Sequence, residues 1–415
     1  MSASKRISVV GLKGMGLLGL VAAGLATSPA ALAQSGGATG EYMAHWAVTT
    51  WVNKTRGVDL QAQIDLAGTQ VKRDTVILYE SWLGNFPYAG VHLTDQGDYM
   101  ARHLTKVAAD IARFVPDANF SGYGVIDYET WYPAWSRLAN TKSDKAADAR
   151  DEDFKDDWED HIKRNRPQVL AGLSGDAYTR ALAASYDQAA QRFYLQTLNE
   201  CKRLRPKAKW GFYGYPYGEY YVSYAPYRDR WKAMNTNEMN WLFDASDALF
   251  PHVYSVMVTV EDRQPIRGKQ ENTPAQNAEY ITENVKEAVR VSRGKPVLPF
   301  VHFKYHPNVG KELEGKRISD LVIRQMIQLP KLAGATGVMI WDCIESDSHF
   351  TLLRDVMAAH VVPMMNQIAV IPQSGAPRAA AAGSSAAATK ATKLPNGQVV
   401  VGKSSKKAKI ASVPN

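Results

Sequence analysis

The sequence contains very little cysteine, with only Cys201 and Cys343 among 415 residues. Two thiols cannot form a four-ligand zinc site of the usual spacing or the disulfide framework of a small cysteine-rich domain. Cys201 falls in a helical pattern and Cys343 follows a strand-like run, so we favour separate thiols and leave a disulfide open. The motifs G-x-S-x-G, H-E-x-x-H and Walker A are also missing, which argues against the serine hydrolase, zinc protease and nucleotide-binding classes that carry them.

The sequence also lacks a hydrophobic run long enough to span a bilayer, which needs roughly 20 residues. Its most apolar stretch, "MGLLGLVAAGLA", follows three basic residues, Lys5, Arg6 and Lys13, and precedes the small-residue sequence Ala31-Leu-Ala33. This order is typical of a secretory signal peptide rather than of a membrane anchor. We therefore expect a signal peptide over 1–33, cleavage near Ala33, a secreted or periplasmic mature protein, and no stable membrane insertion.

Acidic residues are missing from both ends of the chain, and this explains the formal charge of +8. The first 33 residues carry three basic residues, and the chain from Gly375 onward carries seven. Without these ten, 39 of the 49 basic residues remain against 41 acidic ones, a net charge of −2. The body therefore offers no global field for a nucleic acid. The Ala/Ser/Lys-rich segment 374–415 has no aromatic residue, and we expect a disordered tail.

Between these ends, 34–373 reads as one domain in which short β-branched runs alternate with helical patterns. This alternation predicts parallel βα units. Because no Gly-rich phosphate loop follows the first strand, it favours a distorted α/β barrel of the TIM type with about seven strands over a doubly wound sheet. The expected strands are 43–50, 74–80, 122–129, 210–215, 248–255, 296–303 and 337–342, and the expected helices are 99–114, 178–204, 275–293, 318–333 and 350–360. The acid-rich segment 141–166 predicts a solvated loop or helix start.

The stretch "GYGVIDYETWYPAW" places Asp127 and Glu129 at the end of a β-branched run. Residues i and i+2 of a strand share a face, with Cα atoms roughly 6–7 Å apart. In a parallel barrel, catalytic groups lie at the carboxyl ends of strands. Two neighbouring carboxylates resist joint ionisation, which provides a protonated acid beside an anion, as glycoside cleavage requires. A surface strand end or a salt bridge is the alternative interpretation.

Four other expected strands end in large aromatic residues, which are Tyr79, Tyr213, Tyr254 and Trp341. Such rings stack on the apolar faces of sugars, and phenol hydroxyls reach their polar substituents. Each ring alone could be a core residue, but four at one end of successive strands indicate a sugar-binding site. His302 and His306 have i,i+4 spacing in a strand-like context, which argues against a metal pair, so we expect neither a metal nor a cofactor.

The same stretch resembles the signature of the animal and venom hyaluronidases, glycoside hydrolase family 56. Further similar blocks follow in order over roughly 43–360, among them "VILYESWLGNFPY", "RPKAKWGFYGYPY", "NWLFDASDALFPHVYS" and "GATGVMIWD". The resemblance implies a distorted seven-stranded barrel. It also implies hydrolysis of β-1,4 bonds after N-acetylhexosamine, with retention and without a metal.

The resemblance also implies a role for each site residue. Glu129 would be the general acid and then the base, while the acetamido oxygen of the substrate acts as nucleophile. Asp127 would orient that acetamide and stabilise the oxazolinium charge. Tyr213, Tyr254 and Trp341 would line the pocket, and Tyr79 would lie at a subsite.

Two positions depart from the family pattern. Tyr132 replaces an arginine, and Asp342 stands where relatives tend to have glycine. A cation lost and an anion gained would both disfavour a uronate polymer. Three hypotheses follow: an endo-β-N-acetylhexosaminidase acting on hyaluronan or chondroitin, the same chemistry on a neutral polymer such as chitin or peptidoglycan glycan, and a non-catalytic carbohydrate-binding barrel. We expect a monomer whose partner is the polysaccharide.

Overall fold

The computed structural model describes residues 41–48, 64–138, 149–218, 225–255, 257–259, 271–306, 309, 313–344 and 346–370. The predicted signal peptide, 1–33, and the predicted tail, 374–415, lie outside the described residues. No helix in the part of the chain that is described is long and apolar enough to cross a bilayer.

The strands of the body are short and run parallel to their neighbours. One sheet has the order β2-β1-β9-β8 and a second has the order β3-β4-β5, while β6 and β7 form a separate pair. The bounds are β1 Met43–Trp46, β2 Val71–Lys72, β3 Thr75–Tyr79, β4 Tyr123–Asp127, β5 Lys209–Phe212, β6 Val258–Thr259, β7 Glu271–Asn272, β8 Phe300–Val301 and β9 Gly337–Ile340.

Backbone pairing joins the two larger sheets into a closed circuit. On one side, the chain from β2 to β3 is nearly continuous, so the same extended segment pairs with β1 first and with β4 afterwards. On the other side, parallel bridges link Tyr213 to Phe250, Leu249 to Val297 and His252 to Phe300. The segment 248–254 thus lies between β5 and β8. Seven parallel segments of the described chain therefore surround one axis, and the expected distorted (β/α) barrel is confirmed.

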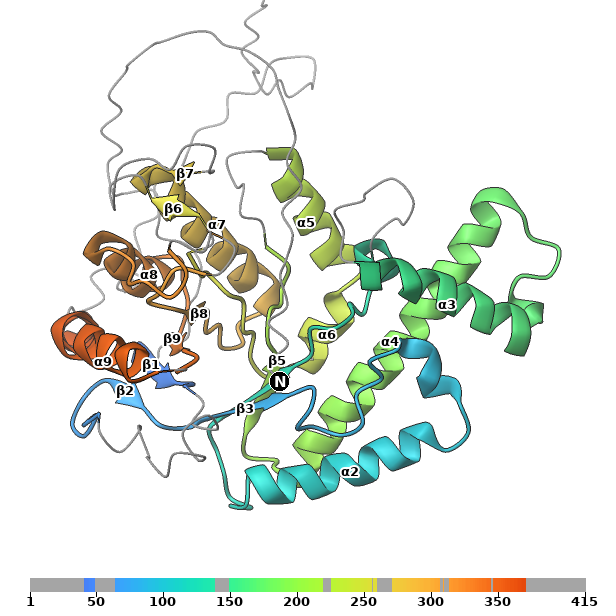
Figure 1. Ribbon diagram of the computed structural model, residues 1–415, viewed down its shortest axis with the longest axis horizontal. Coiled ribbons are helices and arrows are strands. Elements are labelled where there is room, and N and C mark those ends of the chain that lie inside the picture. Colours follow the sequence, from blue (N-terminus) through green and yellow to red (C-terminus); the bar gives the residue numbers. More distant parts are fainter. Residues whose placement is uncertain are drawn as a thin grey trace, which may run out of the picture. The chain divides into compact units, whose positions relative to one another are not determined.

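Helices flank these strands on both sides (Figure 1). Helix α2 packs against α4, and α7 packs against α8. The bounds are α2 Tyr99–Phe114, α3 Ala149–Asn165, α4 Gly175–Leu204, α5 Ala225–Asn237, α6 Asn240–Ala245, α7 Pro274–Ser292, α8 Asp320–Leu332, α9 Asp347–Val356 and α10 Val362–Val370. Helix α7 begins with a capping box, in which Thr273 and Gln276 satisfy each other's backbone N–H groups.

Two kinds of apolar core stabilise the barrel. Inside it, Val125, Phe250, Phe300 and Met339 pack together with the other inward-facing residues of the strands. Outside it, separate clusters fill the space between strands and helices. Gly124 of β4 is needed for this packing, because a Cβ atom there would lie 2.2 Å from the Trp210 ring. The sequence G-Y-G-V-I-D thus fixes a strand that accepts a tryptophan of the neighbouring strand against its backbone.

The differences from the sequence-based expectations concern length rather than order. The expected strand 248–255 forms single bridges instead of a ladder, and the expected strand 296–303 keeps only β8 as a ladder. The acid-rich segment is a helix, α3, over most of its length. Cys201 is buried in α4 and Cys343 is partly buried, and both are free thiols. Strong twist and curvature in a small barrel leave few residues in regular pairing, which periodicity alone cannot reveal.

Candidate functional site

Asp127 and Glu129 lie where β4 leaves the barrel. Asp127 is the last residue of the strand and pairs in register with Tyr79 of β3. Glu129 lies beyond the strand and is exposed, so the expected strand, 122–129, extended two residues too far at its carboxyl end. Tyr128 between them is buried on the opposite side, where its hydroxyl donates to the Leu83 carbonyl at 2.8 Å. The expected alternation of side chains therefore persists past the end of the strand.

The negative charges of Asp127 and Glu129 affect the pKa values of the same two tyrosines, Tyr213 and Tyr254. Burial raises the pKa of the Tyr213 hydroxyl well above its usual value, and Tyr254, Glu129 and Asp127 raise it further. Burial likewise raises the pKa of Tyr254, to which Asp127 and Glu129 again contribute. Two separate strand ends, those after β4 and β5, and the 248–255 segment therefore converge here. Both hydroxyls stay protonated at all ordinary pH values and remain hydrogen-bond donors.

The four predicted aromatic residues form one continuous surface beside the carboxylates. The ring centroids of Tyr213 and Tyr254 are 6.4 Å apart. Tyr254 stacks on Trp341 at 5.8 Å, and the Trp341 indole N–H donates to the Tyr79 hydroxyl at 3.1 Å. The structure thus brings all four together at one end of the barrel. Their binding role stays a prediction.

Histidines lie against the buried side of this aromatic surface. The His252 ring is 5.8 Å from that of Tyr213 and 5.6 Å from that of Tyr254. Burial, reinforced by His306, lowers the pKa of His252 to about 4. His302 contacts Tyr254 and Trp341, with centroids at 5.7 and 5.4 Å. Within the described ranges, no three potential ligands among His, Cys, Asp and Glu gather as a metal site would require.

Asp342 requires a correction of the charge argument made from the sequence. Its carboxylate is fully buried and lies 2.5 Å from the Lys304 ammonium, which is itself 4% exposed. The Lys304 ammonium also donates to the Cys343 carbonyl at 3.0 Å, and His302 lies 3.4 Å from the same carboxylate. Asp342 therefore does not add an uncompensated negative charge beside Trp341. The inference that it repels a uronate was wrong, because the sequence did not show the pairing with Lys304.

Tyr132 also has a cation beside it, although this position holds tyrosine where the family pattern has arginine. The Arg137 guanidinium carbon lies 4.6 Å from the centroid of the Tyr132 ring and 4.8 Å from that of Trp231. Guanidinium groups stack favourably on such rings. Arg137, five residues after Tyr132, thus places a positive charge next to this position.

Glu80 is a site residue that sequence reasoning missed. It follows Tyr79 directly at the end of β3, and its carboxylate accepts hydrogen bonds from the backbone of Glu129 and Thr130. The available signal was positional, since an acidic residue directly after a buried strand resembles the signal that identified Asp127. Without the pairing of β3 with β4, nothing in the sequence indicated that the two strand ends are adjacent.

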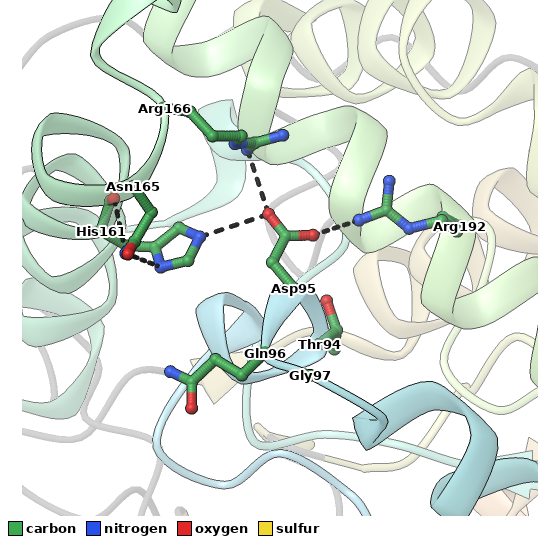
Figure 2. A pocket seen from close by; sticks show the side chains of 8 residues that line it. All are labelled: Thr94, Asp95, Gln96, Gly97, His161, Asn165, Arg166 and Arg192. Atoms are coloured by element: carbon green, nitrogen blue, oxygen red, sulfur yellow. Dashed lines mark hydrogen bonds and ion pairs between the residues drawn. The ribbon is translucent and has the colours of Figure 1, made fainter.

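A second polar site lies between the β3–α2 connection and the helices α3 and α4. It is an open cavity of about 600 Å³ lined by Thr94, Asp95, Gln96, Gly97, His161, Asn165, Arg166 and Arg192 (Figure 2). We call its central group the Asp95 cluster, meaning Asp95 with His161, Arg166 and Arg192.

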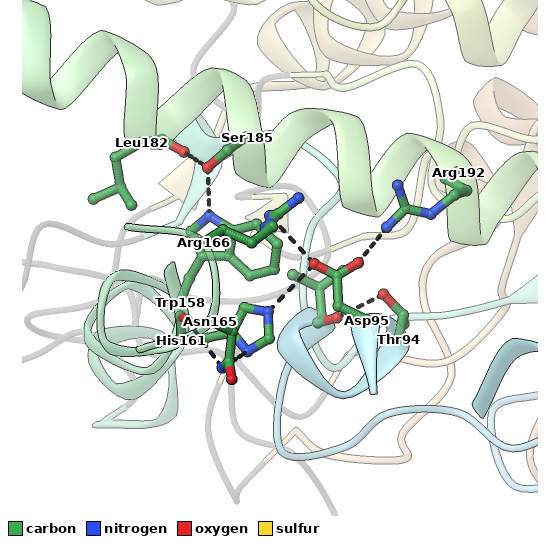
Figure 3. Close-up of polar contacts among 10 residues, drawn as sticks. Thr94, Asp95, Trp158, His161, Asn165, Arg166, Leu182, Ser185 and Arg192 are labelled. Carbon is green, nitrogen blue, oxygen red and sulfur yellow. Dashed lines mark hydrogen bonds and ion pairs between the residues drawn. The ribbon is translucent and has the colours of Figure 1, made fainter. Parts of the chain in front are cut away.

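The Asp95 cluster is held together by ion pairs from three elements. Asp95 lies 3.2 Å from the Arg166 guanidinium and 3.3 Å from His161, and it accepts a hydrogen bond from Arg192. The cluster continues into the core, where the Trp158 indole N–H donates to Ser185 at 2.9 Å (Figure 3). Because one carboxylate is surrounded by two guanidinium groups, it is saturated by cations and serves to join the elements.

Comparison with known proteins shows which family the chain resembles over most of its length. The protein-family model described as hyaluronidase matches residues 41–372. The hyaluronidase of the snake Crotalus adamanteus is 26% identical over 319 residues, covering 71% of this chain and 62% of that protein. The hyaluronidase of the wasp Polybia paulista is 28% identical over 242 residues, covering 58% and 74%. The chain thus spans less than two thirds of the length of the snake relative.

Solved structures give the same fold. The crystal structure of bee venom hyaluronidase superposes with a TM-score of 0.60 at 22% identity, covering 78% of this chain and 99% of that one. Its complex with a hyaluronic acid tetramer gives a TM-score of 0.59, covering 80% and 100%. The match of the family model extends over nearly all of the described barrel, including both carboxylates and all four aromatic residues. On these grounds, the chain belongs to the hyaluronidase family of glycoside hydrolases.

Proposed function

We propose that this protein is a secreted retaining endo-β-N-acetylhexosaminidase that hydrolyses β-1,4 bonds of hyaluronan or chondroitin. One observation carries the proposal: Asp127, in register with Tyr79 at the end of β4, and Glu129 two residues later lie at the end of the barrel where Tyr79, Trp341 and Tyr254 contact one another. Family membership supports the reaction class. The bound hyaluronic acid tetramer in the bee venom enzyme supports the substrate class.

In the proposed reaction, Glu129 protonates the glycosidic oxygen as the bond to the anomeric carbon breaks. The carbonyl oxygen of the substrate's acetamido group attacks that carbon, which gives a cyclic oxazolinium ion and the released chain end. Glu129, now a carboxylate, takes a proton from water as the water oxygen attacks the anomeric carbon and reopens the ring. Two displacements at one carbon give retention, and Glu129 ends protonated as it began.

Asp127 accepts the acetamide N–H in this scheme and stabilises the positive charge that develops on the ring. It lies on the strand, with its backbone in the β3–β4 ladder, so its position is fixed more firmly than that of an exposed loop residue. The Tyr213 and Tyr254 hydroxyls are permanent donors, while Trp341, held by Tyr79, provides an apolar face for a sugar ring. The reaction needs neither a metal nor a cofactor.

The acidic polymers are preferred over a neutral amino-sugar polymer. Asp342 and Tyr132 were the two residues expected to disfavour a uronate polymer, and each of them has a cation next to it. We further propose export after removal of 1–33, a catalytic domain over 34–373 with a separate tail over 374–415, and action as a monomer on the polysaccharide.

The test compares the wild type with Glu129→Gln on hyaluronan, chondroitin and chitin oligosaccharides. The wild type should release new reducing ends from the uronate polymers, with N-acetylhexosamine at the end of each product by mass spectrometry. The variant should lose about 10³-fold or more in kcat, since a positioned general acid contributes up to about 10⁴-fold. Arg203→Gln, on the exposed side of α4, is the control variant and should retain the wild-type rate. Turnover that survives in Glu129→Gln would contradict the assignment.

A further inference from the structure

Glu80 lies directly at the edge of the proposed catalytic site, and the proposed mechanism gives it no role. Its Oε1 atom accepts the backbone N–H of Glu129, at 2.5 Å, and also that of Thr130. Its Oε2 atom accepts the Thr130 hydroxyl at 2.6 Å. One carboxylate therefore receives three hydrogen bonds from two consecutive residues, and one of these is the proposed acid.

These bonds begin where the regular strand pairing stops. Tyr79 and Asp127 are the last residues in register between β3 and β4, so the ladder does not reach Glu129. Glu80 is the residue after Tyr79, and its side chain replaces the backbone carbonyl that a longer ladder would supply. Hydrogen bonds to an ionised acceptor are roughly twice as strong as neutral ones. The exposed backbone of Glu129 is therefore held although the strand has ended.

The surrounding contacts restrict the same turn from its other side. Within the loop that follows Glu80, the Leu83 carbonyl accepts the Tyr128 hydroxyl at 2.8 Å, and the Pro87 carbonyl accepts the Trp131 indole N–H at 2.9 Å. Both of those bonds involve side chains that point away from the catalytic side. In this set of contacts, it is Glu80 that bonds to the backbone of Glu129 itself. The hydrogen bonds of Tyr128 and Trp131 hold the residues on either side, and the hydrogen bond to Glu80 holds the backbone of Glu129.

We infer that Glu80 is a positioning residue that holds the Glu129 backbone in the conformation needed for proton transfer. This inference rests on the proposed function, because it assigns the purpose of the contact to the acid role of Glu129. An error of about 1 Å in the placement of a catalytic group can cost about 10²-fold in rate. The Cα atom of Glu129 sets the origin of its side chain, so release of the backbone displaces the carboxyl group without altering the aromatic surface.

The experiment measures kcat, KM and backbone amide exchange for Glu80→Ala, Glu80→Gln and Thr130→Val. Glu80→Ala removes all three bonds and should lower kcat about 10- to 100-fold with KM within about threefold of wild type. Glu80→Gln keeps an acceptor oxygen for both backbone N–H groups and should recover kcat to within about fivefold of wild type. Thr130→Val removes only the hydroxyl bond and should change kcat by less than about threefold.

Amide exchange of the peptide that contains Glu129 and Thr130 tests the contact without any need for turnover. Exchange should be faster in Glu80→Ala than in wild type and intermediate in Glu80→Gln. Unchanged exchange in Glu80→Ala would overturn the inference, as would a wild-type kcat in that variant or a loss that Glu80→Gln does not recover. If wild type cleaves no glycan, the proposed function fails, and with it the purpose assigned to Glu80, whereas exchange would still decide the contact.

Discussion

The strand-end site and the Asp95 cluster both place carboxylates in polar surroundings, yet the chemistry of those surroundings differs. Asp95 is bordered by two guanidinium groups and an imidazole. Asp127 and Glu129 instead lie near Tyr213 and Tyr254, whose hydroxyl groups stay protonated and carry no charge. A carboxylate saturated by cations stabilises the fold, whereas one among protonated donors can still exchange a proton. The cavity of about 600 Å³ at the Asp95 cluster therefore surrounds a carboxylate that is already paired with cations.

After that of Glu129→Gln, the largest expected effect comes from Asp127→Asn at the strand-end site. The substitution preserves shape but removes the charge that stabilises the oxazolinium ion, so kcat should fall about 10²- to 10³-fold. Steady-state release of reducing ends from hyaluronan measures this. The matched change Asp95→Asn should leave kcat within about twofold of wild type. Equal losses in the two variants would remove the distinction between the two sites.

A second test concerns the ion pair behind the aromatic surface. Lys304→Met leaves the Asp342 carboxylate buried without its ammonium partner, and the free energy of unfolding should fall by about 3 kcal/mol. The double variant Lys304→Met/Asp342→Leu should regain most of that loss, because neither charge then has to be desolvated. Urea unfolding of the three proteins measures both values. A double variant as unstable as the single one would show that the pair contributes more than mutual neutralisation.

A third test uses pH. Burial lowers the pKa of His103, His252 and His306 to about 4, against an ordinary value of 6.5. Below pH 6.5 the unfolded chain therefore binds more protons than the native one, so stability falls as the pH decreases toward 4. Each histidine should remove about 1–2 kcal/mol between pH 6.5 and 5.

His252→Gln tests this because it removes one titrating group from the strand-end site. Urea unfolding at pH 7, 6 and 5 should show a smaller decrease in the variant than in wild type, whatever the variant's stability at pH 7. Parallel curves for the two proteins would mean that His252 does not titrate in the range expected.

The smallest expected effect is that of Asp95→Ala on stability. The variant loses three charge-assisted contacts, but Arg192 is 40% exposed and regains water, so the free energy of unfolding should fall by only about 1–2 kcal/mol. Thermal unfolding measures the shift, and added salt should reduce the difference from wild type. A large loss of glycan cleavage together with this small shift would assign the cluster a role in the reaction.

Much of the strand-end site could be predicted because it depends on local patterns. The D-x-E sequence after a β-branched run placed Asp127 and Glu129 correctly on one side, with Tyr128 opposite. The aromatic residues were found because parallel strands end at the same face. Glu80 was missed because its partner lies 49 residues away, and no local pattern contains that contact. The neutralisation of Asp342 was missed for the same reason, since Lys304 lies on a different strand end.

The sequence by itself determined the order of strands and helices, the side of the chain on which each carboxylate lies, and the family. These depend on periodicity and on residue types that neighbouring positions define. Tertiary structure alone decided which strand ends adjoin, and therefore which carboxylates are paired with a cation, which hold a backbone and which face tyrosines. The physical reason is that charge and hydrogen bonding act through space over a few ångströms, where residues far apart in the chain become immediate neighbours.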